Sequence, residues 1–240
     1  MQNKTQCIFN WSGGKDSTLA LHYALQDNSL EIKYLVTTIT EKYNRVSMHG
    51  VRESLLIKQA ESIGIPLYQI RLPEMPDMKT YDDVMKTHMS KFKAEGITHS
   101  IFGDIFLEDL KKYREEKLSE IGMKAIFPLW SINSSIIIDD FLTLEYKTII
   151  VCAQQNLKYI CGKVLDNELI NSLPSEIDSC GENGEFHTFA FDGPLFKNKI
   201  SFTIGELVFR TYSKPLSTGQ DSSLSTSESD ILGFWYVDLE

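Results

Sequence analysis

Short apolar runs alternate with amphipathic stretches through the first half of the chain. The runs rich in apolar and β-branched residues have the length of buried strands, and they cover residues 7–11, 32–40, 66–73, 99–105 and 124–130. The stretches between them carry apolar residues at helical spacing and predict helices over residues 16–26, 51–64, 81–96 and 107–122. The last three of these helices end at a glycine, the residue that favours a helix C-terminus.

This alternation of strand and helix is typical of parallel βαβ units with right-handed crossovers. Strands of such sheets are buried on both faces, which explains why the runs are almost entirely apolar. The pattern therefore predicts an α/β fold with a five-stranded parallel, Rossmann-like sheet and helices on both of its faces. Ligands of these sheets bind beyond the carboxyl ends of the strands, so the residues that follow each strand are the candidates for function.

The second half of the chain has a different pattern. A helix is expected over residues 134–146 and a strand over residues 147–154, and the remainder has the pattern of short strands and turns. Residues 217–230 form a polar, serine-rich tract that is typical of a solvated loop. We therefore expect two domains, a ligand-binding domain over residues 1–135 and a smaller C-terminal α+β domain over residues 136–240.

Composition narrows the class of protein. The chain has 240 residues, 42% of them apolar, and no run of about 18 apolar residues, which disfavours a membrane span. The N-terminus lacks a basic segment followed by an apolar one, so no secretion signal is expected. The four cysteines are scattered without a C-x-x-C pair, which disfavours a zinc site or a disulfide framework. A reduced, cytoplasmic protein is expected, and its net charge of −9 disfavours a nucleic-acid partner.

The sequence SGGKDS, residues 12–17, follows the first predicted strand and precedes the first predicted helix. It departs from the phosphate-loop pattern G-x-x-x-x-G-K-[ST] at two places. Phe9 stands where the first glycine of that pattern belongs, and Asp16 follows the lysine where a hydroxyl residue belongs.

These six residues nevertheless have the chemistry of an anion cradle. The two glycines, Gly13 and Gly14, allow a positive φ and a close approach of the backbone to a ligand. A helix that begins near residue 16 directs its N–H groups and positive dipole toward the loop. The other side chains add two hydroxyl groups, one cation and one carboxylate that suits Mg²⁺; they are Ser12, Ser17, Lys15 and Asp16. A glycine turn with a capping side chain is the alternative interpretation.

The sequence GENGEFHT, residues 181–188, concentrates polar side chains between glycines. These side chains offer metal binding, general-base catalysis or orientation of an amine. The residues concerned are Glu182, Asn183, Glu185 and His187, together with Gly181 and Gly184. An acidic turn leading into a strand is the alternative. Cys180 directly precedes this stretch, and a lone cysteine is more often inert than reactive.

The loop SGGKDS after a first strand resembles that of the PP-loop ATP pyrophosphatases. Two further stretches are FGDIFLEDLKKYREE, residues 102–116, and DSCGENGEFHTFAFDGPLF, residues 178–196. With them the chain resembles the diphthine–ammonia ligase family, also described as adenine nucleotide alpha-hydrolase-like, from about residue 4 to about residue 209. The resemblance implies a HUP-type fold and cleavage of ATP between its α- and β-phosphates. The loop would hold pyrophosphate, and Mg²⁺ would accompany ATP.

The resemblance also implies roles for the candidate residues. It implies that ATP is bound by residues 12–17, His49, Gly103, Asp104 and Arg114. It implies Mg²⁺ ligation by Asp16 and Asp104, acceptor binding by Cys180, Gly181, Glu182, Asn183, Gly184, Glu185 and His187, and catalysis by Lys15, Asp16, Glu182, Glu185 and His187. For His49, Asp104 and Arg114 a structural role is the alternative, with Asp104 as a helix cap and Arg114 on a solvated face.

One departure from the family pattern bears on the acceptor. Members that amidate diphthine typically carry a GEGGEYET-like string, whereas this chain has Asn183 in place of a glycine and His187 in place of an acid. The string of this chain, GENGEFHT, is typical of bacterial-type members. We therefore expect an AMP- and pyrophosphate-forming ligase that adenylates a carboxylate-type acceptor for amidation by ammonia. The acceptor would be a small molecule or protein-borne, and other than diphthine. A homodimer is compatible with the sequence.

Two other functions are weighed against this one. A tRNA-modifying, thiolation-type enzyme of the same superfamily would need a reactive cysteine, for which Cys180 is the candidate. It would also need an RNA-binding surface, which the net charge disfavours. A nucleotide-binding sensor without turnover would use the same loop and signal through its second domain.

Overall fold

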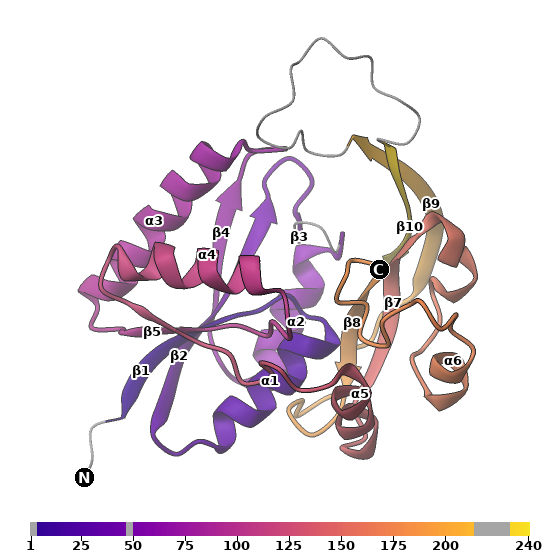
Figure 1. The fold of residues 1–240 in the computed structure, drawn as a ribbon, viewed down its shortest axis with the longest axis horizontal. Coiled ribbons are helices and arrows are strands. Elements are labelled where there is room, and N and C mark those ends of the chain that lie inside the picture. Colours follow the sequence, from indigo (N-terminus) through magenta and orange to yellow (C-terminus); the bar gives the residue numbers. More distant parts are fainter. Residues whose placement is uncertain (1–3, 47–49, 214–230) are drawn as a thin grey trace.

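The chain forms two β-sheets that lie beside each other, with helices packed around them (Figure 1). The computed structural model describes residues 4–46, 50–213 and 231–240. The candidate His49 and the serine-rich tract over residues 217–230 lie outside the described residues. No helix within the described ranges is both long and apolar enough to cross a lipid bilayer.

Sheet A contains the five predicted parallel strands. They are β1 (Thr5–Asn10), β2 (Leu30–Thr40), β4 (Leu67–Leu72), β5 (His99–Ile101) and β6 (Lys124–Ile126). They run parallel in the order β4-β2-β1-β5-β6, and the two-residue β3 (Arg45–Val46) pairs antiparallel with the end of β2. The predicted Rossmann-like sheet is confirmed. Its strand order reverses beside β1, which places the residues after β1 where open α/β sheets bind their ligands.

Alternate residues of β1 face opposite sides of sheet A, as the two-residue period of a strand requires. Cys7 and Phe9 pack in one hydrophobic cluster with α1 (Lys15–Gln26) and α2 (Glu53–Ile63). Ile8 lies in a second cluster that includes side chains of α3 (Met78–Ala94) and α4 (Glu108–Ser119). Helices therefore cover both faces, as predicted. Helix α2 ends at Gly64, whose φ of 87° is the left-handed conformation that favours glycine.

Sheet B is antiparallel, with the order β8-β7-β10-β9. Its strands are β7 (Lys147–Gln154), β8 (Phe186–Asp192), β9 (Ile204–Ser213) and β10 (Ile231–Leu239). The helical elements of this half are α5 (Ser134–Thr143), the 3₁₀ helix η1 (Gln155–Ile160) and α6 (Asn167–Asn171). The helix expected over residues 134–146 ends earlier, and Glu145 shortly after it has a left-handed φ of 61°.

One hydrophobic cluster runs through both sheets. It includes Leu56 of α2, Ile150 of β7 and Phe189 of β8, each no more than 1% exposed. The two halves of the chain thus share buried apolar surface. The division into domains at residue 135 stays a prediction.

Candidate functional site

The loop after β1 has a conformation that only its glycine sequence allows. Gly13 has a φ of 80°, and a Cβ atom at this position would lie 2.7 Å from Oε1 of Gln59. Helix α1 then begins at Lys15, with the hydroxyl groups of Ser17 and Thr18 donating to the carbonyl oxygen of Gly14 at 3.0 and 2.8 Å. The loop is therefore fixed by its own sequence at the N-terminus of a twelve-residue helix, where N–H groups attract anions.

Sheet B supports this loop from behind. The backbone N–H of Ala190 donates to the carbonyl oxygen of Gly13 at 2.8 Å, and the N–H of Lys15 donates to Oγ1 of Thr188 at 3.0 Å. Gln59 of α2 is fully buried between the two segments, and its Nε2 donates to the carbonyl oxygens of Gly13 and Ala190 at 3.0 and 2.6 Å. Strand β8 of sheet B and helix α2 thus hold this loop together.

Gln59 and Thr188 were not among the residues singled out from the sequence. For Gln59 a signal exists, because it lies in α2 among the buried residues Leu55, Leu56 and Ala60. A glutamine on the buried side of an amphipathic helix requires hydrogen-bond partners. Its Oε1 accepts from Nε1 of Trp11 at 2.9 Å, which completes its hydrogen bonding.

Lys15 is the buried cation of the site, with 2% of its surface exposed. Its Nζ lies 2.8 Å from both carboxylate oxygens of Asp16 and also donates to the carbonyl oxygen of Cys180. Burial acts to lower the pKa of Lys15, but the Asp16 carboxylate outweighs it and the pKa lies above its ordinary value. The side chain therefore carries a full positive charge at neutral pH.

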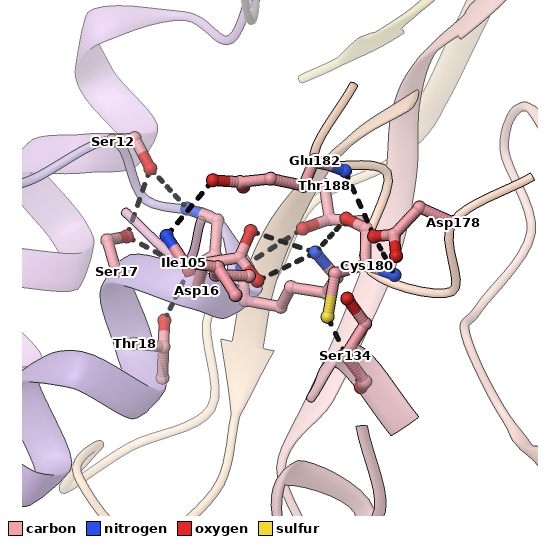
Figure 2. Close-up of polar contacts among 12 residues, drawn as sticks. Ser12, Asp16, Ser17, Thr18, Ile105, Ser134, Asp178, Cys180, Glu182 and Thr188 are labelled. Carbon is pink, nitrogen blue, oxygen red and sulfur yellow. Dashed lines mark hydrogen bonds and ion pairs between the residues drawn. The ribbon is translucent and has the colours of Figure 1, made fainter. Parts of the chain in front are cut away.

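The loop over residues 178–186 faces the loop that carries Ser12 and Asp16 (Figure 2), and its Cys180 carbonyl oxygen accepts from Nζ of Lys15. Asp178 organises this loop, because its Oδ1 accepts from the N–H groups of Cys180 at 2.9 Å and Glu182 at 3.2 Å. The Oε1 of Glu182 accepts from the N–H of Ile105, beyond β5, at 3.0 Å. Burial raises the pKa of Glu182 to about 7, and the negative charge of Asp16 adds to this effect.

Glu185 has a different position from Glu182. It is 5% exposed and does not line the cavity described below. Its Oε1 accepts from the N–H of Asp178 at 3.2 Å and from Nδ2 of Asn183 at 3.1 Å. Its Oε2 has no hydrogen-bond partner among the described residues. These contacts hold the shape of the loop.

His187 and Cys180 both lie in the wall of the cavity. His187 is on β8, opposite Cys152 of β7, and burial together with the charge of Lys15 lowers its pKa to about 4. Its imidazole is therefore neutral at physiological pH. The thiol of Cys180 is buried, donates to the carbonyl oxygen of Ser134 at 3.5 Å, and has a pKa that burial raises far above its usual range. A thiol in this state is a poor nucleophile.

The segment after β5 lies against the N-terminus of α1. A Cβ atom on Gly103 would lie 3.1 Å from the N atom of Ser17, which is tighter than an ordinary contact, so this close approach favours a glycine. Asp104 forms an ion pair with Arg114, in which Nη2 donates a hydrogen bond to Oδ1 at 3.1 Å. The Nε atom lies 2.9 Å from Oδ2 without hydrogen-bond geometry. Burial raises the pKa of Asp104, while Arg114 opposes that shift. Arg114 of α4 thus contacts Asp104 at the candidate site.

These segments enclose a cavity of about 1060 Å³ between the ends of β1 and β2, helices α3 and α4, and the loop that precedes β8. The cavity reaches the upper end of the size range of small-molecule sites. The predicted residues that line it are Ser12, Gly14, Lys15, Asp16, Ser17, Gly103, Asp104, Arg114, Cys180, Gly181, Glu182, Asn183, Gly184 and His187. Gly13 and Glu185 lie outside the lining set and support it.

The carboxylates of the cavity suit a magnesium ion that is held mainly by a ligand. Mg²⁺ is usually bound by one or two carboxylates together with phosphate oxygens and water. Asp16 and Asp104 both line the cavity, and they are close enough for the charge of Asp16 to raise the pKa of Asp104. Within the described part of the chain, no three His, Cys, Asp or Glu side chains form a metal cluster. Asp16 and Asp104 therefore fit a magnesium ion that a bound ligand would share.

The sequence matches the family model of the diphthamide synthase N-terminal domain over residues 5–125 and that of the diphthamide synthase C-terminal domain over residues 133–213. The chain belongs to the diphthamide synthase family. Among its relatives in this family is the rat diphthine–ammonia ligase, 25% identical over 235 residues, which are 83% of this chain and 84% of the relative.

The bovine diphthine–ammonia ligase is 28% identical over 171 residues, 62% of this chain and 62% of that protein. The human diphthine–ammonia ligase is 28% identical over 174 residues, 63% of each. In these alignments the chain spans about three fifths of the length of the bovine and human relatives.

A more distant likeness is to the solved structure of the U34-tRNA thiolase NcsA from Methanococcus maripaludis with its [4Fe-4S] cluster. Its TM-score is 0.38 at 18% identity, over 60% of this chain and 58% of the thiolase. A likeness of that extent supports no conclusion about the function of this diphthamide synthase family member.

Proposed function

We propose that this chain is an ATP-dependent ligase that forms AMP and pyrophosphate while joining ammonia to a carboxylate acceptor. The observation that carries the proposal is the position of Lys15. Its buried ammonium group stands at the N-terminus of α1 in a cavity of about 1060 Å³, between the loop after β1 and the Glu182 loop. Both the pyrophosphate and the acceptor would therefore meet at one cation. The names of the curated relatives agree with this chemistry.

The first step transfers AMP to the acceptor. A carboxylate oxygen attacks the α-phosphorus of ATP, the bond between the α- and β-phosphates breaks, and pyrophosphate leaves with the electron pair. The residues that would hold the leaving group are Ser12, Gly14, Lys15 and Ser17, which line the cavity. Lys15 and the N–H groups of α1 stabilise the negative charge that builds on pyrophosphate. Mg²⁺ on Asp16 and Asp104 would neutralise further phosphate charge when it is bound with ATP.

The second step replaces AMP by ammonia at the acyl carbon. The nitrogen lone pair forms the C–N bond, the C–O bond to AMP breaks, and the nitrogen gives up a proton. We assign Glu182 as the base that takes this proton, because it lines the cavity and its pKa of about 7 leaves it partly ionised at neutral pH. His187 is a hydrogen-bonding group toward the acceptor, since its pKa of about 4 keeps it uncharged.

The acceptor is proposed to be a carboxylate other than diphthine, on a small molecule or a protein. Asn183 and His187 line the cavity at the positions where this chain departs from the GEGGEYET-like string. They present an amide and a neutral imidazole beside Glu182. The acceptor surface therefore carries one negative charge fewer than the GEGGEYET-like string would give, because that string has an acid in place of His187. That difference supports a different acceptor.

A thiolation reaction receives less support from this site. Its candidate nucleophile, Cys180, is 2% exposed and has a thiol pKa raised far above its usual range. Such a thiol is not a thiolate at neutral pH. A sensor without turnover would need the same cavity, and it is separated from the ligase by the experiment below.

The test uses an acceptor pool of carboxylates or a cell extract with ATP, Mg²⁺ and ammonia. An acceptor labelled with ¹⁸O in its carboxylate should deliver one labelled oxygen to AMP, with pyrophosphate as the other product. The Lys15→Met variant provides the background rate. Release of ADP and phosphate would contradict the proposed bond cleavage. Nucleotide binding with no turnover across the whole panel would support the sensor instead.

A further inference from the structure

Strand β9 (Ile204–Ser213) is the outer strand of sheet B and lies at the opposite edge from β8. The side chains over residues 203–211 are all exposed. They include several large apolar ones, with Ile204 60%, Leu207 and Val208 39% and Phe209 37% exposed. An outer strand presents a row of N–H and C=O groups that can pair with another strand.

The sequence of β9 lacks two of the features that usually prevent such pairing, proline and lysine. Outer strands are commonly protected by proline, lysine or a bulge. Residues 204–213, IGELVFRTYS, contain neither proline nor lysine. Their register with β10 is regular from Ser213 to Leu207, and a bulge or irregularity lies between Leu207 and Ile204, at the start of the strand. The charged side chains of this strand are Glu206 and Arg210. Neither of them forms an ion pair with any other described residue.

We propose that β9 pairs antiparallel with β9 of a second copy of this chain, about a two-fold axis at Val208. The two sheets B would then join into one sheet of eight strands, an isologous interface in which each contact occurs twice. The side chains on the two faces of the strand support this inference. Glu206 and Arg210 lie on one face, and Leu207 and Phe209 lie on the other.

On one face of the strand, the two-fold axis brings opposite charges together. With Val208 opposite its own copy, Glu206 of each chain lies opposite Arg210 of the other, because both residues are two positions from the axis. Within one chain these two side chains are four strand residues apart, about 13 Å, which is too far for a direct ion pair. Cross-strand pairs of opposite charge stabilise antiparallel strands.

On the other face, the same axis pairs apolar side chains. Leu207 of each chain lies opposite Phe209 of the other, one position from the axis on either side. Phe209 already packs on Trp235 of β10, with ring centroids 4.9 Å apart, so this face continues the apolar surface of the sheet. An axis at Leu207 instead would put Glu206 opposite Val208 and Ile204 opposite Arg210. The complementarity therefore selects Val208 as the centre.

The pairing leaves the candidate site accessible. His187 and Thr188, which belong to the site, are on β8, and two strands separate β8 from β9 in the order β8-β7-β10-β9. Dimerisation through β9 and ATP turnover are therefore independent properties. A variant that loses one should keep the other.

The test is sedimentation equilibrium of the full chain over a series of concentrations. The wild type is expected to show a dimer, and Val208→Lys, which places two ammonium groups at the axis, is expected to give the mass of one chain. The control Leu25→Lys changes an apolar side chain on α1 that is 44% exposed, and it should leave the dimer unchanged. A monomeric wild type at every concentration, or a Val208→Lys variant that remains dimeric, would overturn the proposal.

Two charge variants test the register. Glu206→Arg and Arg210→Glu should each weaken the homodimer about tenfold or more, since both replace two attractive pairs by two repulsive ones. A mixture of the two variants restores both attractive pairs and should form a heterodimer. The double variant E206R/R210E should again form a homodimer. If the mixture remains monomeric while the wild type dimerises, the axis at Val208 is wrong.

Discussion

The Oε1 atom of Glu182 accepts a hydrogen bond from the backbone N–H of Ile105 at 3.0 Å, which ties the loop before β8 to the segment after β5. This contact closes one side of the cavity across 77 residues of sequence. It also leaves the carboxyl group in a buried environment that raises its pKa to about 7.

The first prediction concerns the pH dependence of stability. The pKa of Glu182 rises from 4.5 to about 7 on folding, so the folded state binds this proton more tightly than the unfolded state. The resulting stabilisation is complete below pH 4.5 and is lost as the pH rises through 7. Relative to Glu182→Gln, the wild type should lose on the order of 1 kcal/mol of unfolding free energy between pH 5 and pH 8, after allowance for solvent screening. Urea unfolding at both pH values measures this difference, and a constant difference would contradict it.

The second prediction concerns the cation of the site. Lys15→Met should lower the rate of AMP formation by about 100-fold or more, because it removes the charge that faces the leaving pyrophosphate. The matched control is Lys112→Met, at a position on α4 whose side chain is 76% exposed and outside the cavity. Rates at saturating ATP measure the effect. A Lys15→Met variant with the wild-type rate would refute the role of this residue.

The third prediction concerns magnesium. Asp104→Asn should raise the Mg²⁺ concentration needed for half-maximal ATP turnover by about tenfold, since one of two anionic ligands is lost. Arg114→Ala should do the same more weakly, because without its partner in the 2.9 Å ion pair the buried Asp104 is more readily protonated. Titrations of turnover against Mg²⁺ at fixed ATP provide the measurement. An unchanged midpoint in Asp104→Asn would exclude Asp104 as a ligand.

The fourth prediction concerns Cys180. Cys180→Ser should keep ATP turnover within about threefold of the wild type, because this residue contributes its backbone carbonyl to Lys15 and its buried thiol has a strongly raised pKa. Thiol-labelling rates offer a second readout, in which the half-buried Cys161 should react before Cys180. Loss of all activity in Cys180→Ser, with normal stability, would instead favour a thiolation reaction.

The fifth prediction concerns Gln59. Gln59→Ala should lower the free energy of unfolding by about 3 kcal/mol or more, since it leaves the carbonyl groups of Gly13 and Ala190 and the indole N–H of Trp11 without their buried partner. Gln26→Ala, at an exposed position on α1, is the matched control. Urea unfolding curves of the two variants compare them directly. Equal stability would show that these groups find other partners.

Much of sheet A could be predicted from the sequence because its signals are local. The apolar run around Ile8 and the glycine at position 64 each report the structure of their own segment. The loop over residues 12–17 was also predictable, since glycine, lysine and hydroxyl residues act there as neighbours in sequence. The end of α5 was less so, because the left-handed Glu145 has no glycine to mark it.

The contacts between distant segments could not be predicted in the same way. The contact from Thr188 to Lys15 joins residues 173 positions apart, and that from Gln59 to Ala190 joins residues 131 positions apart. Neither leaves a periodic signal in the sequence. Glu182 and Glu185 looked equivalent as two acids in one short string, yet one lines the cavity and the other holds the loop. Only the folded chain distinguishes them.

The hydrogen bond from Ala190 to Gly13 has a consequence for how such chains evolve. The loop over residues 12–17 lies in the first half of the chain, but β8, which supports it, lies in the second half. Recombination that exchanges one half between distant relatives would separate the loop from the strand that shapes it. We therefore expect the two halves to be inherited together, with substitutions around Gln59 matched by substitutions along β8.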